Sequence, residues 1–82
     1  MLKPVPVPIA DIYVPAAQRK ELDDAKVDRA AEDLMGDDDV SPIQVRKGKG
    51  RYVLVKGIHR LEAAKALGEE TIDVLVVAAR KH

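Results

Sequence analysis

The chain contains no cysteine, no tryptophan and no phenylalanine, and its aromatic residues are limited to Tyr13 and Tyr52. The lack of cysteine excludes disulfides, thiol catalysis and thiolate metal ligands, and it fits a reducing compartment. Two tyrosines do not form the stacking surface that single-stranded nucleic acid requires. The chain also has no net charge, because 14 lysine and arginine residues balance 14 acidic residues. An electrostatic attraction of the whole protein to DNA or RNA is therefore not expected.

Long apolar runs are absent as well. No segment approaches the roughly 20 apolar residues of a membrane-spanning helix, and the first residues lack the apolar stretch of a secretory signal. We therefore expect a cytoplasmic protein without a membrane partner. The length of 82 residues, of which 46% are apolar and 34% charged, predicts one globular domain over residues 1–82.

The N-terminal part predicts an extended segment followed by a helix. Prolines alternate with valine and isoleucine in residues 3–9, which indicates an edge strand or a polyproline-like segment, because proline cannot donate a ladder hydrogen bond. Asp23 or Asp24 can cap the helix, and Gly36 can end it. The acidic run at 37–39 is interpreted as a solvated loop in preference to a metal site, because no second ligand cluster follows. The apolar residues at helical spacing are Val27, Ala30, Ala31 and Leu34.

The second half predicts a hairpin, a helix and a last strand. A glycine-rich turn at 48–50 joins the two strands of the hairpin, and Gly68 ends the second helix. The succession of strands and helices predicts a small α+β domain. The expected elements span residues 43–47, 51–55, 58–67 and 71–77. The residues of the second helix that we expect in the core are Ile58, Leu61, Ala64 and Leu67.

The sharpest chemical pattern lies where the hairpin runs into the second helix through Gly57. No Ser, Thr, Asp or Asn stands there to cap the first helical turn. Lys56, His59 and Arg60 add positive charge to a helix start that is already electropositive. This arrangement becomes favourable when an anion docks on the backbone N–H groups of residues 58–61, and glycine lets the anion approach closely.

A purely structural interpretation accounts for the same residues. Gly57 is then a neutral N-cap, His59 donates to a nearby carbonyl, and Arg60 pairs with an acid such as Glu62. The spacing alone does not decide between the two interpretations.

The segment Gly57-Ile58-His59-Arg60-Leu61-Glu62-Ala63 resembles the Gly-x-His/Arg-Arg-x-x-Ala box of the ParB/sulfiredoxin superfamily. Upstream and downstream segments at 22–27, 42–46 and 70–72 resemble a helix and two strands of that family. The resemblance implies a small mixed β-sheet with two main helices and a site for nucleotide phosphates at this turn. ParB proteins bind CTP there, whereas sulfiredoxins and related archaeal free-serine kinases use ATP.

Carried over residue by residue, the resemblance assigns the phosphates to Gly57, Ile58, His59 and Arg60, with Lys26 as a further cation. It implies ATP or CTP as the cofactor, with Mg²⁺ carried by the nucleotide. Ile58 stands where sulfiredoxins have their catalytic cysteine and ParB proteins usually have a glutamate. Its side chain can be neither nucleophile nor base, so sulfinic acid reduction is excluded and ParB-type hydrolysis is not expected.

We therefore expect a nucleotide-phosphate-binding regulatory or accessory domain without sulfiredoxin activity. One alternative is a phosphotransferase or nucleotidase with Glu62 as base, although pairing of Glu62 with Arg60 or Lys65 is the favoured role. Another is a DNA-associated protein, similar to partition or plasmid regulators, that acts through a protein partner or as a dimer. We expect DNA contacts to be weak or indirect, because the basic hairpin residues are interpreted as a solvated turn: Arg46, Lys47, Lys49 and Arg51.

Overall fold

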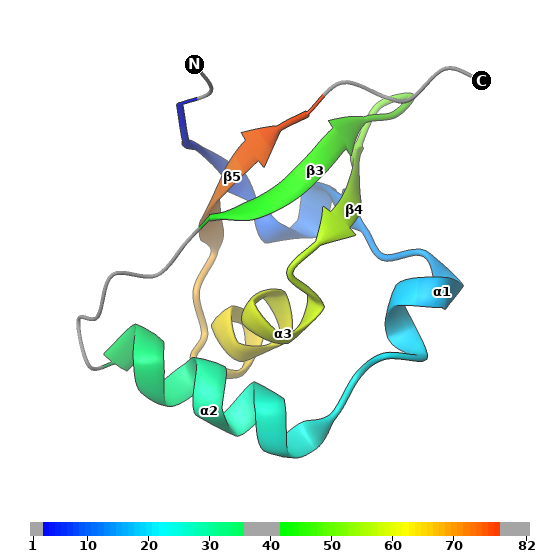
Figure 1. The fold of residues 1–82 in the computed structure, drawn as a ribbon. Helices are drawn as coiled ribbons and strands as arrows, with labels where there is room; N and C mark the ends of the chain where they lie inside the picture. Colours follow the sequence, from blue (N-terminus) through cyan, green and yellow to red (C-terminus); the bar gives the residue numbers. More distant parts are fainter. Residues whose placement is uncertain (1–2, 36–41, 78–82) are drawn as a thin grey trace.

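The computed structural model describes residues 3–35 and 42–77 (Figure 1). Most of these residues belong to five strands and three α-helices, which form one mixed sheet with its covering helices. The elements are β1 (Val5–Pro8), the 3₁₀-helix η1 (Ile9–Asp11), β2 (Ile12–Tyr13), α1 (Ala16–Arg19), α2 (Asp24–Met35), β3 (Ile43–Lys47), β4 (Tyr52–Lys56), α3 (Ile58–Ala66) and β5 (Thr71–Val76).

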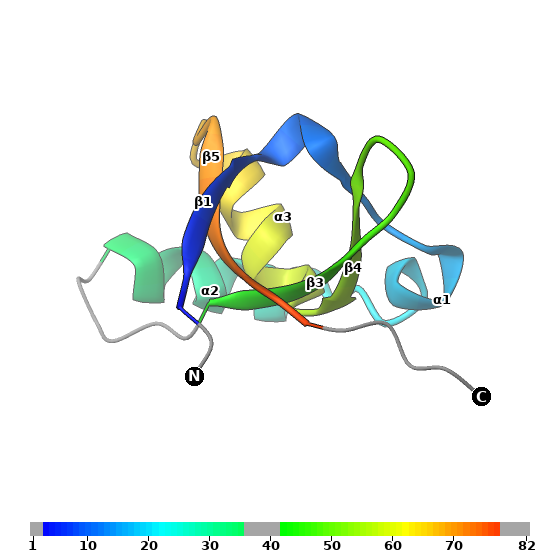
Figure 2. The same cartoon turned by 90° about the horizontal axis from the view of Figure 1, so that it is seen from above.

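The sheet has the strand order β1-β5-β3-β4-β2 and curls around α3, as Figure 2 shows. β1 pairs antiparallel with β5, and β3 pairs antiparallel with β4. β3 and β5 are parallel, as are β2 and β4. The expected small α+β fold with a mixed sheet is thus confirmed.

The proline-rich N-terminus forms an edge strand, which settles the choice between strand and polyproline-like segment. Val5 of β1 pairs with Val74 of β5, and Val7 pairs with Ile72. Pro6 and Pro8, which alternate with these valines, are exposed. An edge position tolerates the missing N–H groups of proline, because one side of the strand has no ladder partner.

The core lies between the concave face of the sheet and α3. Leu61, Val45 and Val74 are fully buried there. α2 packs along another side of α3 (Figure 1). Burying these side chains is the main stabilising contribution in so small a domain. The core residues are Val7, Ile9, Ile12, Val14, Ile43, Val45, Leu54, Ile58, Leu61, Ala64 and Val74.

The end of α3 confirms Gly68 as its stop signal but corrects the expectation for Leu67. Gly68 has a φ of 79°, and the bonds Gly68 N to Lys65 O and Glu69 N to Ala64 O form a Schellman motif. Leu67 is the C-cap and is 38% exposed, so its predicted place in the core is wrong. Leu67 has the spacing of the buried residues of α3, but the helix ends at Ala66 and the chain turns away at Leu67.

Other expectations are corrected in part. The strand expected over 51–55 is β4 at Tyr52–Lys56, and within it Val55 is 38% exposed, whereas Val53 and Leu54 are buried. The short helix α1 was not expected. Gly36 and the acidic run at 37–39 lie outside the described residues. Across 3–35 and 42–77, no helix has both the length and the hydropathy to span a membrane.

Candidate functional site

Gly57 joins β4 to α3 in a left-handed conformation, with φ 111° and ψ 33°. It is the N-cap of α3, and no side chain caps the helix. The first bond of α3 runs from Leu61 N to Gly57 O at 3.0 Å, so the amides of Ile58 and His59 have no acceptor within the helix. The uncapped helix start expected from the sequence is therefore present at Ile58 and His59, but the expectation that the Leu61 N–H faces an anion is wrong, because it is already bonded to Gly57 O.

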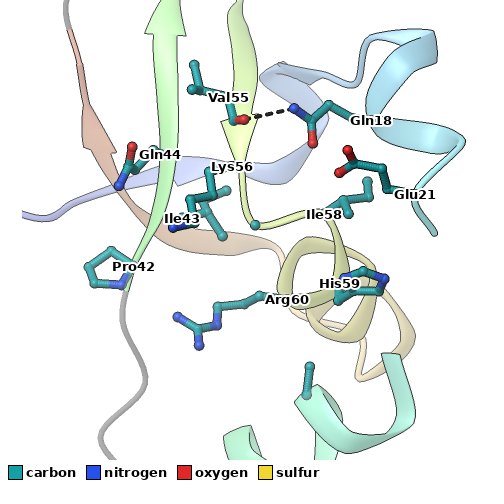
Figure 3. Close-up of a pocket in the computed structure, with 12 residues that line it drawn as sticks. Gln18, Glu21, Pro42, Ile43, Gln44, Val55, Lys56, Ile58, His59 and Arg60 are labelled. Atoms are coloured by element: carbon teal, nitrogen blue, oxygen red, sulfur yellow. Dashed lines mark hydrogen bonds between the residues drawn. The ribbon is translucent and has the colours of Figure 1, made fainter. Parts of the chain in front are cut away.

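A cavity of about 730 Å³ opens at this helix start. Figure 3 shows Gln18 and Glu21 on one side of it and Pro42, Gln44 and the Arg60 guanidinium on the other. The cavity thus combines parts of α1, α2, β3, β4 and α3. Its lining residues are Gln18, Glu21, Ala30, Pro42, Ile43, Gln44, Val55, Lys56, Gly57, Ile58, His59 and Arg60.

The β3 wall of the cavity contains an irregularity. The register of β3 against β4 shifts between Gln44 and Val45, as in a β-bulge. Such bulges redirect side chains and are common beside functional sites. Gln44 is half-buried and lines the cavity, where its amide offers both a donor and acceptors.

The charges around the cavity are unequal. Lys56 and Arg60 carry positive charge, and Glu21 carries negative charge. The His59 ring accepts a hydrogen bond at Nε2 from the backbone N–H of Asp23, at 3.1 Å. This contact differs from the carbonyl partner of the purely structural interpretation. A ring that accepts at Nε2 is not a cation, so Lys56 and Arg60 supply the positive charge.

The structure brings four of the five expected site residues together: Gly57, Ile58, His59 and Arg60 all line the cavity. The Ile58 side chain belongs to the core and is 4% exposed, so what it offers an anion is its backbone amide. Lys26 is exposed on α2 and is not among the lining residues. These assignments to phosphate remain predictions.

Glu62, the carboxylate considered as a base, has a different environment. Its Oε2 lies 3.0 Å from Nζ of Lys65, which matches the pairing role favoured from the sequence. Glu62 lines a separate, smaller hollow of about 320 Å³ together with Arg19 and Lys65. The carboxylate at the larger cavity is that of Glu21, which sequence reasoning missed.

Glu21 and Gln18 carry no sequence signal that marks them as site residues. They lie on α1 and just after it, far upstream in the sequence of the helix start that they approach. A hydrogen bond from Gln18 Nε2 to Val55 O, at 2.8 Å, secures this approach. Over the described segments, no group of three or more histidine, aspartate or glutamate residues is placed to hold a metal ion.

These features define a small α+β domain with a partly cationic cavity at a strand–glycine–helix turn. The model of the ParB N-terminal domain family matches residues 3–82 of the chain. The chain therefore belongs to the ParB N-terminal domain family.

Solved structures support the same fold. Sulfiredoxin from Arabidopsis thaliana has a TM-score of 0.81 and 27% identity, over 94% of this chain and 86% of that one. C-terminally truncated chromosome-partitioning protein ParB from Caulobacter crescentus, complexed with CTP-gamma-S, has a TM-score of 0.80 and 22% identity. This match covers 96% of our chain but 46% of that protein.

A mutant free serine kinase in complex with AMP has a TM-score of 0.77 and 18% identity, over 90% of this chain and 30% of the kinase. At 22% and 18% identity, the ParB and kinase similarities establish the common fold. No curated protein sequence matches the chain significantly.

Proposed function

We propose that this domain binds the phosphates of a nucleotide in the cavity at the start of α3. The observation that supports it most directly is the uncapped N-terminus of α3, which opens into a cavity lined by Lys56 and Arg60. Helix-start N–H groups and a guanidinium are well suited to phosphate oxygens. Lys26 is proposed as an additional, outer cation.

A nucleotide fits this cavity better than a free phosphate ion does. The volume of about 730 Å³ lies in the usual range for sites that enclose small organic ligands. Apolar surface from Ala30, Pro42 and Val55 is available to a ribose or base, and Gln44 offers an amide to a base edge. Proteins of the same fold hold CTP-gamma-S and AMP, so we propose ATP or CTP, with Mg²⁺ carried by the phosphates.

The test is thermal unfolding of the chain with ATP, CTP and inorganic triphosphate, each with and without Mg²⁺. A ligand at 100 times its Kd stabilises the folded state by about 2.7 kcal/mol. That corresponds to a rise of well over 5 °C in Tm for a domain of this size, since each 1 kcal/mol shifts Tm by about 4–8 °C. No rise with any nucleotide at millimolar concentration would contradict the proposal. An equal rise with inorganic triphosphate would show that the base contributes nothing.

A phosphotransferase is the second candidate, and the position of Glu21 favours it. This carboxylate lines the same cavity as the helix start, whereas Glu62 lines another hollow. In such a reaction Glu21 would take the proton of an acceptor hydroxyl as its oxygen attacks the terminal phosphorus, and the nucleoside diphosphate would leave.

The two carboxylates make a matched pair for testing this candidate. Release of nucleoside diphosphate is measured for the wild type, Glu21→Gln and Glu62→Gln, with a panel of small alcohols and with water as acceptor. The second candidate requires turnover that Glu21→Gln abolishes and Glu62→Gln leaves unchanged. If the wild type shows no turnover, binding alone remains.

A further inference from the structure

Two hydrogen bonds attach the segment 18–23, which we call the strap, to the two sides of Gly57. On the strand side, Gln18 Nε2 donates to Val55 O at 2.8 Å. On the helix side, the backbone N–H of Asp23 donates to Nε2 of His59 at 3.1 Å. The strap is therefore anchored at both ends to the turn that forms the proposed phosphate site.

The direction of the second bond determines the state of the His59 ring. A backbone amide can only donate, so His59 Nε2 must be unprotonated to accept from Asp23. A neutral ring with a bare Nε2 carries its proton on Nδ1. If His59 donates to a phosphate oxygen, Nδ1–H is the group that can do so.

The strap carries Glu21 between its two anchors, and Glu21 lines the cavity. The anchor at Asp23 also leads directly into α2. The Asp23 carboxylate accepts from Ala25 N at 2.9 Å, and Asp23 O accepts from Val27 N at 3.0 Å. Movement at His59 would thus be transmitted to Glu21 and to the first turn of α2 together.

We infer that His59 is a positioning residue: its Nε2 holds the strap and thereby sets the place of the Glu21 carboxylate at the cavity. Gln18 has the same role on the strand side. The consequence for a bound nucleotide rests on the proposed function, but the anchoring itself does not.

The first test uses the chain without nucleotide, with His82, the other histidine, replaced by glutamine. Long-range ¹H–¹⁵N correlation at mildly alkaline pH, where a free imidazole is neutral, reports which ring nitrogen of His59 carries the proton. We expect the proton on Nδ1. A ring protonated on Nε2 would overturn the inference, and this measurement needs no variant of His59.

The second test compares His59→Gln with His59→Asn by hydrogen exchange at the Asp23 amide. The terminal oxygen of glutamine lies near the position of Nε2, whereas that of asparagine lies near Nδ1. We expect glutamine to preserve the protection of the Asp23 amide and asparagine to accelerate its exchange about tenfold or more. Equal exchange in both variants would overturn the inference, with protection of the Leu61 amide in α3 as the control for folding.

Nucleotide binding is then measured on the same variants. If the chain with His59 intact also binds no nucleotide while Nδ1 carries the proton and Asp23 responds as expected, the proposed function fails and the anchoring role stands. If nucleotides bind but the His59 ring carries its proton on Nε2, or the Asp23 amide exchanges equally in both variants, the positioning role fails and the binding site stands.

Discussion

The Cβ atom that an alanine would carry at position 57 would lie 2.6 Å from Cγ2 of Ile43. Real Cβ contacts are not this short, and Ile43 is a buried core residue that cannot move away cheaply. The φ of 111° at Gly57 adds backbone strain for any side chain. We expect Gly57→Ala to lower the free energy of unfolding by about 2–4 kcal/mol, measured by urea denaturation.

Gly68→Ala is the matched control. Its φ is 79°, but nothing lies within 4 Å of the methyl group that alanine would add, so backbone strain alone acts there. We expect a loss of about 1–2 kcal/mol. If both substitutions cost the same, the contact with Ile43 contributes nothing, and the left-handed backbone conformation by itself accounts for glycine at 57.

The comparison between Gly57 and Glu21 shows what the sequence could and could not indicate. Helices, strands and the uncapped turn follow from local periodicity, glycine and the absence of a capping residue, so they were predictable. Two other features depend on tertiary packing between distant segments: the contact of Gly57 with Ile43, and the position of Glu21 at the cavity. The four residues of α1 are too few to show a helical period, and nothing in them marks the strap.

Arg60→Ala tests the cation at the cavity. Arg60 is half-buried and lines the cavity beside the helix start. Loss of a charge-assisted contact of about 1.5–3 kcal/mol would weaken nucleotide affinity roughly tenfold to a hundredfold. Isothermal titration calorimetry measures the affinity. We expect the affinity of Arg60→Lys to lie between those of the wild type and Arg60→Ala.

Arg46→Ala serves as the control for Arg60, because Arg46 is exposed on β3 and is not among the cavity residues. It removes the same charge from the chain and should leave the affinity nearly unchanged. Equal weakening by both variants would indicate a diffuse charge effect. An unchanged affinity in Arg60→Ala would remove this residue from the site.

Asp23→Ala tests the cap of α2. The sequence left Asp23 and Asp24 open as caps, and the bond from Ala25 N to Asp23 Oδ1 identifies Asp23. Removing an N-cap side chain costs about 1 kcal/mol. We expect urea denaturation to show this decrease in the free energy of unfolding. Asp28→Ala, which removes an exposed acid from the middle of the helix, should cause a smaller decrease. Equal losses would show that net charge, and not the cap, matters.

The Leu61 and Leu67 positions test the buried face of α3. Leu61 is 0% exposed and Leu67 is 38% exposed, although both match the spacing of the core face. Leu61→Ala should destabilise by about 2–5 kcal/mol, which would unfold much of so small a domain, and Leu67→Ala by less than about 1 kcal/mol. Circular dichroism during urea titration measures both, and similar losses would contradict the observed end of α3.

Glu21→Gln tests the electrostatics of the cavity in the absence of metal. The Glu21 carboxylate lines the same cavity as the proposed phosphates, so it repels them when no cation lies between. Glutamine keeps the size of the side chain and removes that charge. We expect metal-free nucleotide affinity to rise severalfold at low salt and the gain to shrink at high salt, because salt screens the repulsion.

Glu62→Gln removes an equal charge beside the separate hollow and should give no such gain. An affinity that falls in Glu21→Gln would instead mean that this carboxylate accepts a hydrogen bond from the nucleotide, which would place a ribose or base, and not the phosphates, next to the strap.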